Sequence, residues 1–182
     1  LLCNYVFLDH AERARFVRGS SHEYLIDQVQ HTGPLSTSSD TVVLDFQHPV
    51  KELVWTIRNA GHGLFEYDNV RDTGTDTFVS GGLILNGRPR FADRDAAYFR
   101  LTQPYEHHTR VPTKHVYCYS FALNPEAHQP TGSCNFSRLD KASLHLRGLK
   151  QQTNGDGELL LYAVSHNLLR VEGGSARLTF HV

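Results

Sequence analysis

The chain has 182 residues, of which 40% are hydrophobic and 20% are charged, and its formal net charge is −1. This length and composition are typical of one globular domain that can bury a core without disulfides. The near-neutral charge argues against a nucleic-acid-binding protein, which usually carries a basic excess or stripe. No run approaches the 18 apolar residues that predict a transmembrane helix. We therefore expect no direct contact with nucleic acid and no transmembrane segment.

The N-terminal region combines a strand-like apolar run with a helix signal. The chain begins Leu-Leu-Cys and contains no methionine, so we interpret it as a piece of a longer gene product. In the segment that follows, Asp9 can cap a helix, Glu12 stands at the capping-box position and Gly19 offers a stop. These residues predict a helix of about two turns. A second short helix is predicted at 93–100, where Asp93 is the candidate cap.

Alternation of apolar and polar residues dominates the remaining sequence. Segments 41–46, 51–58, 142–149 and 175–182 each place apolar side chains on one face, as half-buried antiparallel strands do. Segment 158–166 is apolar on both faces, which predicts a central strand covered on both sides. Eight strands are predicted in total, at 22–30, 41–47, 50–58, 78–86, 115–123, 137–147, 158–167 and 175–182.

Strands at this density, joined by turns and long crossovers, predict an all-β fold. The specific prediction is an antiparallel eight-stranded jelly-roll sandwich with one or two short helices. Pro49 interrupts what would otherwise be one long strand, so a bulge or an edge position is expected there. Asn59–Gly82 is a long connection, and such a loop in a compact β domain is usually functional, a binding edge or simply mobile.

Catalytic and metal-binding motifs are not evident. The twelve histidines include no pair separated by two, three or four positions, so neither HxH nor HExxH occurs. The sequence has no CxxC, GxSxG, GxGxxG or GxxxxGK[ST]. The three widely spaced cysteines are expected to be free thiols. We predict no enzyme activity, no cofactor and no metal, although a triad or a metal site assembled from distant residues stays open.

The segment Tyr119–Asp140, YSFALNPEAHQPTGSCNFSRLD, is expected to be a strand–loop–strand joint. Phe121 and Leu123 are predicted in the core before the loop, and Phe136 and Leu139 after it. The loop path is expected to be fixed by its prolines and glycine, which are Pro125, Pro130 and Gly132. Hydrogen bonds that fix the loop or join subunits are expected from Glu126, His128 and Gln129.

Asn135-Phe136-Ser137 is also an N-glycosylation sequon. Such triplets occur often by chance, and modification requires a lumenal route. We favour a structural role in which Phe136 enters the core while Asn135 and Ser137 satisfy backbone groups at the loop exit. Glycosylation of Asn135 remains the alternative.

Several stretches together resemble the major capsid protein of nucleocytoplasmic large DNA viruses, the group that includes iridoviruses and algal phycodnaviruses. The most specific of them lies within Val116–Asp140. The stretches are NYVFLDHAERARFVRGSSHEYLIDQVQ, FQHPVKELVW, LILNGRPRF, YFRLTQPYEHHTRVP and VYCYSFALNPEAHQPTGSCNFSRLD. The resemblance runs from about Asn4 to the C-terminus, nearly the whole chain.

The resemblance implies two consecutive jelly rolls per subunit and a homotrimer whose six jelly rolls form a pseudo-hexagonal capsomer. Such capsomers tile an icosahedral shell over an internal lipid membrane. Residues 21–182 would be the C-terminal jelly roll, and residues 1–20 the last strand of an upstream jelly roll with a linking helix. The first jelly roll is missing from this chain, which departs from the family pattern.

The implied location is the capsid of the virion, with assembly in the host cell cytoplasm. The implied partners are neighbouring capsomers and minor capsid proteins, with host glycans or a receptor as a further class. A glycan- or receptor-binding jelly-roll module is the alternative function. The residues of the most specific motif, all expected to be structural, are Tyr119, Phe121, Pro125, Glu126, His128, Gln129, Pro130, Gly132, Asn135, Phe136, Ser137 and Arg138.

Overall fold

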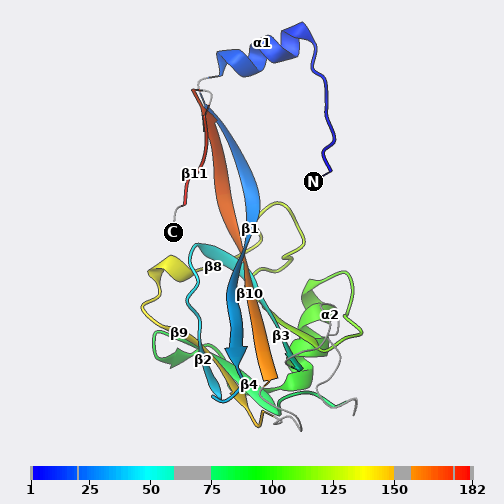
Figure 1. Cartoon of the computed structure of the whole chain (residues 1–182), viewed down its shortest axis with the longest axis vertical. Coiled ribbons are helices and arrows are strands. Elements are labelled where there is room, and N and C mark those ends of the chain that lie inside the picture. The colour runs from blue at the N-terminus through cyan, green and yellow to red at the C-terminus, as the bar shows by residue number, and fades with distance from the viewer. Residues whose placement is uncertain (1, 20, 60–74, 150–156, 174, 181–182) are drawn as a thin grey trace. The chain divides into compact units, whose positions relative to one another are not determined.

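The computed structural model describes residues 2–19, 21–59, 75–149, 157–173 and 175–180 (Figure 1). It divides into two units. The larger is Asp27–His166, and the smaller combines Leu1–Ile26 with Asn167–Val182. Two long strands contribute residues to both units, β1 (Ser21–Ser36) and β10 (Gly157–Glu172).

The strands form two antiparallel sheets, which confirms the predicted jelly-roll sandwich. The first has the order β1-β10-β3-β7, and the second has the order β2-β9-β4-β5. Short or terminal strands extend them, since β8 pairs with β3, β11 with β10, and β6 with β4. The remaining bounds are β2 (Thr41–Val43), β3 (Pro49–Asn59), β4 (Ser80–Leu85), β5 (Arg88–Pro89), β6 (Arg94–Asp95), β7 (Val116–Ser120), β8 (Cys134–Asn135), β9 (Ala142–Arg147) and β11 (Ser175–Leu178).

Each of the eight predicted strands corresponds to one strand of the structure, although the lengths differ. The structure also contains the short strands β5, β6 and β8, which have two residues each. Alternation over so short a span does not reveal a strand. The predicted strand at 137–147 begins only at Ala142, because Phe136–Arg138 forms a short 3₁₀ helix, η2. The predicted strand at 115–123 ends at Ser120.

The core lies between the two sheets of the larger unit. Leu53, Trp55 and Ile57 of β3 are buried on one side, and Leu144 and Leu146 of β9 are buried on the other. These are the faces that period-two alternation predicts. Burial of Leu159–Leu161 likewise confirms β10 as a central, doubly covered strand, because it lies between β1 and β3.

A β-bulge interrupts the alternation at Lys51. In the β3–β10 ladder Val164 lies opposite Glu52 while Ser165 lies opposite Val50, so Lys51 is the extra residue on β3. The bulge explains how Val50 and Leu53, which are three positions apart, both enter the core. Pro49, where a bulge or an edge position was expected, is instead the first residue of β3 and pairs with Asn135.

The first predicted helix is confirmed as α1 (His10–Arg18) in the smaller unit. The Asp9 side chain accepts a hydrogen bond from the Glu12 backbone N–H at 2.7 Å, as an N-cap residue does. Glu12 therefore contributes to the cap through its backbone N–H.

Among the described residues, no helix is long and apolar enough to cross a membrane.

The second predicted helix is longer and starts later than expected. A π-helical turn, η1 (Tyr98–Thr102), continues into α2 (Gln103–His107). Asp93 does not cap it, since the Asp93 carboxylate instead lies 2.8 Å from Arg147 Nε of β9. The sequence pattern does not reveal this ion pair because its two members are distant along the chain.

The smaller unit has few buried side chains. β11 pairs with the end of β10, and the Asn167 side chain bonds both the N–H and the C=O of Phe180. The predicted buried face of 175–182 is wrong for the residues that the structure describes, because Ala176 and Phe180 are exposed. Residues 2–9 contain no strand in this chain.

Candidate functional site

The most specific sequence motif begins where β7 ends against the bulge of β3. The Lys51 carbonyl accepts hydrogen bonds from the backbone N–H of Phe121 at 2.9 Å and of Ala122 at 3.2 Å. These bonds turn the chain out of the ladder after Ser120. The predicted continuation of the strand is therefore wrong, and Leu123, expected in the core, is 77% exposed.

The loop then closes on itself through Asn124 and Thr131. The Thr131 hydroxyl donates to the Asn124 carbonyl oxygen and accepts from the Asn124 N–H, both at 2.9 Å. The Asn124 side chain accepts from the Glu126 N–H at 3.1 Å, which is an Asx-turn. Pro125 is buried within this turn, whereas His128, Gln129 and Pro130 are exposed.

Gly132 leads the loop back toward the sheet with φ of +143°. A Cβ atom at this position would lie 2.9 Å from the Phe121 carbonyl oxygen and 3.3 Å from the Ala122 Cα. Both the backbone conformation and the close approach therefore require glycine. The expectation that Gly132 fixes the loop path agrees with this geometry.

The loop exit is held by the sequon residues. The Asn135 side chain accepts from the Ser137 N–H at 3.1 Å and caps η2, while the Ser137 hydroxyl oxygen accepts from the His48 N–H at 2.8 Å. Phe136 is buried in the core, and its N–H donates to the His48 carbonyl at 3.0 Å. Asn135 and Ser137 thus accept hydrogen bonds from backbone groups at the loop exit, and Phe136 lies in the core, the geometry that their expected structural role requires. Arg138 is exposed, and Leu139 is partly buried against the core.

A row of aromatic rings connects the two ends of the motif. Tyr119 and Phe121 have ring centroids 5.1 Å apart, and Phe121 and Phe136 are 5.8 Å apart, both edge to face. Phe91, from the β5–β6 connection, lies 4.9 Å from Tyr119. Burial raises the pKa of Tyr119 despite the opposing effect of nearby Arg90. This row fixes the strand end, the loop exit and a neighbouring connection together.

The loop between β7 and β8 is called the motif loop below, and Glu126 joins it to the segment after α2. Its carboxylate accepts hydrogen bonds from the Thr109 N–H at 3.1 Å and from the Thr109 hydroxyl at 3.3 Å. A ring nitrogen of His107 lies 2.9 Å from the Leu123 carbonyl oxygen. These hydrogen bonds agree with the loop-fixing role expected of Glu126, although its partner, 17 positions away, was not predicted.

Replacing Glu126 by alanine is expected to lower the free energy of unfolding by about 1 kcal/mol, because two hydrogen bonds to Thr109 are lost at an exposed site. Urea denaturation of the variant and the parent chain measures this difference. Glu106→Ala, which removes a 53% exposed carboxylate from α2, is the control and should change stability less. An equal loss in both variants would contradict the loop-fixing role.

A second polar network, which the sequence pattern did not reveal, holds η1 against the sheet. Arg100 Nε lies 2.6 Å from Asp76 Oδ1, and the Tyr117 hydroxyl donates to the same oxygen at 3.2 Å. The Thr77 N–H donates to the Tyr117 hydroxyl oxygen at 3.2 Å. Burial raises the pKa of Tyr117 to about 12, so the phenol stays protonated and remains a donor. The network is structural and holds no exposed reactive group.

The three cysteines are free thiols, as expected, and differ in accessibility. Cys3 is exposed, whereas burial, with the charge of Glu52, raises the pKa of the Cys118 thiol to about 12. Burial also raises the pKa of Cys134. Alkylation of the native chain at pH 7.5 should therefore modify Cys3 first and Cys118 last. Mass spectrometry after denaturation without reductant should find three alkylated cysteines, and fewer would contradict the free-thiol assignment.

No three His, Cys, Asp or Glu side chains come together to hold a metal ion in the parts of the chain that the structure describes. The geometry of the motif is that of a folded joint. The side chains of Asn124, Thr131, Asn135 and Ser137 bond the backbone, and Phe136 enters the core, whereas Leu123 stays exposed. What remains accessible is the outer surface of the loop, which includes His128 and Gln129.

Comparisons with known proteins agree with this architecture. The family model described as the large eukaryotic DNA virus major capsid protein matches residues 12–177. The chain is 42% identical to the major capsid protein of Pyramimonas orientalis virus, over 99% of this chain and 48% of that protein. It is 34% identical to the major capsid protein of Paramecium bursaria Chlorella virus 1, over 97% of this chain and 52% of that protein.

A solved structure shows the same fold. The VP54 protein of PBCV-1, fitted into a reconstruction of the virophage Sputnik, has a TM-score of 0.82 and 29% sequence identity. The match covers 98% of this chain and 56% of that chain. The chain thus spans about half the length of the curated relatives that it matches.

Proposed function

Because this chain belongs to the major capsid protein family of large eukaryotic DNA viruses, we propose that it is a structural subunit of an icosahedral viral capsid. The observation that carries the proposal is the family match over residues 12–177 of a two-sheet sandwich. A shell subunit needs a rigid sandwich with accessible lateral surfaces, not a reactive cleft. The motif loop, closed by its own hydrogen bonds, suits that requirement.

Within this proposal, residues 21–182 are the C-terminal jelly roll of a double jelly roll, and residues 1–20 are the end of the preceding one with its linking helix. The complete subunit forms a homotrimeric, pseudo-hexagonal capsomer in the virion, assembled in the host cell cytoplasm. It contacts neighbouring capsomers and minor capsid proteins. Exposed His128 and Gln129 are candidates for such contacts, because they protrude from a loop whose base is fixed.

The test uses the full-length gene product that contains this segment. Native mass spectrometry and light scattering should give a trimer without a bound cofactor. A monomer at all accessible concentrations would contradict the proposal. Replacing His128 and Gln129 together by alanine tests the loop surface, with His31→Ala, an exposed change on β1, as the control. Loss of higher assembly in the first variant alone is the expected result.

The alternative of a glycan- or receptor-binding module would be favoured by an exposed aromatic platform in the connection Asn59–Gly82. Residues 60–74 of that connection lie outside the described residues. Binding of the full-length protein to a glycan array, without trimer formation, would favour this alternative over the shell subunit.

A further inference from the structure

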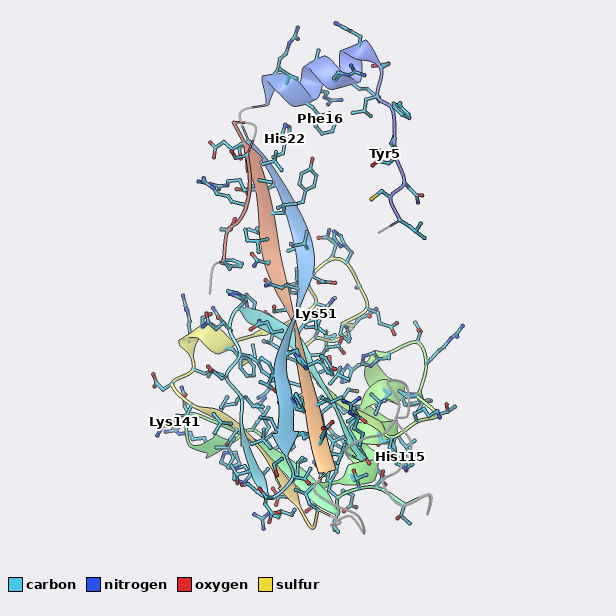
Figure 2. The ribbon with its side chains drawn as sticks, in the orientation of Figure 1. Tyr5, Phe16, His22, Lys51, His115 and Lys141 are labelled. Carbon is cyan, nitrogen blue, oxygen red and sulfur yellow. The ribbon has the colours of Figure 1, made fainter. Side chains whose placement is uncertain are left out.

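Three ionisable side chains form a row across three neighbouring strands of the larger unit. Asp27 lies on β1, His166 on β10 and Lys51 on β3, in the order in which these strands pair. Lys51 Nζ lies 2.7 Å from Asp27 Oδ2, and His166 Nδ1 lies 3.4 Å from Asp27 Oδ1. The carboxylate of Asp27 therefore faces both the Lys51 ammonium and the His166 ring. Figure 2 shows Lys51 beside β1 and β10.

Strand geometry buries this row on the sheet face opposite the core. Leu161 and Ala163 point into the core, so alternation turns His166 to the other face. Alternation back from Trp55 and Leu53 would turn the Lys51 side chain toward the core. Because Lys51 is the bulge residue, its side chain is released from that face. Lys51 is 4% exposed and His166 is 6% exposed. An ammonium this deeply buried requires a counter-charge, and Asp27 supplies it.

The His166 ring is poorly satisfied in this surrounding. Its Nδ1 is at ion-pair distance from Asp27 but makes no aligned hydrogen bond, and its buried Nε2 has no hydrogen-bond partner among the described residues. Burial lowers the pKa of His166, and the charges of Lys51 and His128 lower it further, while Asp27 partly opposes them. The imidazole is therefore neutral at pH 7, and its neighbours are one carboxylate and one ammonium.

We propose that Asp27, Lys51 and His166 form an acid-sensitive latch that holds β1 to β10 and β3 at neutral pH and loosens on acidification. A proton on His166 places a second buried cation beside Lys51, with a single carboxylate between them. Among the described residues, the other titratable group whose charge acts on the ring is His128 of the motif loop, and that charge disfavours a proton on His166. The inference concerns the folded unit itself and holds whether or not the chain builds a shell.

The direction of the pH effect follows from proton linkage. The pKa of His166 is lower in the folded chain than its ordinary value of about 6.5, so the open state binds the proton first. The contribution of His166 to the stability of the latch is therefore greatest above about pH 6.5. It falls as the pH drops from the pKa of His166 in the open state to its lower pKa in the folded state. One linked proton increases the opening equilibrium by at most about tenfold per pH unit in that window.

The experiment is hydrogen exchange with mass spectrometry on the full chain at pH 7.5, 6.5 and 5.5, corrected for intrinsic exchange rates. Peptides from 27–36 and 157–166 report on the latch, and peptides from 142–147 of β9 serve as an internal reference. The opening of the latch peptides should rise by up to about tenfold between pH 6.5 and 5.5 in the parent chain. The reference should rise less.

Two variants decide the outcome. His166→Gln should remove the pH dependence of the latch peptides, whereas His31→Gln, on β1, should retain it. If His166→Gln keeps the parent's pH dependence, the proposal is wrong. Lys51→Met provides a second test, because without the ammonium a protonated His166 faces mainly Asp27. Its acid-induced opening should be smaller than the parent's, and an equal or larger opening would also overturn the proposal.

Discussion

Replacing Trp55 by alanine is expected to remove most of the stability of the larger unit. Trp55 is fully buried in the middle of β3, with ring centroids 5.2 Å from Phe99 and 6.1 Å from Tyr117. Truncating a buried tryptophan costs about 3–5 kcal/mol, because both the transfer energy and the packing around the cavity are lost. Since domains of this kind are stable by about 5–15 kcal/mol, the variant should unfold at much lower urea concentration.

The measurement is urea denaturation followed by circular dichroism at 25 °C, with the parent chain alongside. Tyr105→Ala is the control, because Tyr105 is also aromatic but is 80% exposed on α2. It should change the free energy of unfolding by no more than about 0.5 kcal/mol. A Trp55→Ala chain with the parent's denaturation midpoint would contradict the assignment of Trp55 to the centre of the core.

Gly132→Ala is expected to destabilise the motif loop, and with it the connection between β7 and η2. The φ of +143° is a conformation that L-residues rarely adopt, which costs about 1–3 kcal/mol. The new Cβ would also press on the Phe121 carbonyl oxygen at 2.9 Å, and backbone cannot move aside as a flexible side chain can. Thermal denaturation should show a lower midpoint, with faster hydrogen exchange in 121–136.

Two other glycines separate the causes of that loss. Gly87 has φ of +75° but no atom within 4 Å of an added Cβ, so Gly87→Ala measures conformational strain without crowding. Gly33 has neither a positive φ nor a neighbour within 4 Å, so Gly33→Ala should be neutral or slightly stabilising. The expected order of destabilisation is Gly132, then Gly87, then Gly33. A Gly132→Ala variant no worse than Gly87→Ala would show that crowding is unimportant.

Local patterns predicted the parts of this fold that local interactions determine. Alternation identified the core faces of β3 and β9 because each strand keeps its period over several residues. The cap at Asp9 and the backbone bond of Asn135 were predicted because each of these side chains bonds the backbone within three positions. Such signals depend little on what the rest of the chain does.

Contacts between distant segments were the ones that sequence reasoning missed. Leu123 was assigned to the core on alternation alone, but the Lys51 carbonyl turns the chain away three residues earlier. Likewise, Asp93 can cap a helix by residue type, yet Arg147 on β9 takes its carboxylate. The Lys51 carbonyl and the Arg147 side chain can be identified as partners only once the strands that carry them are placed in the fold. The resemblance identified the family but not these contacts.

Lys51 has a consequence for how this sheet can change between related proteins. Without Lys51, Val50 and Glu52 would follow one another and point to opposite faces, so the alternation of β3 with β10 would continue unbroken. The residue thus behaves as a one-residue insertion, and its gain or loss leaves the apolar residues of β3 facing the core. A buried charge on the sheet face opposite the core can therefore be gained or lost by a change in chain length, without any substitution in the core.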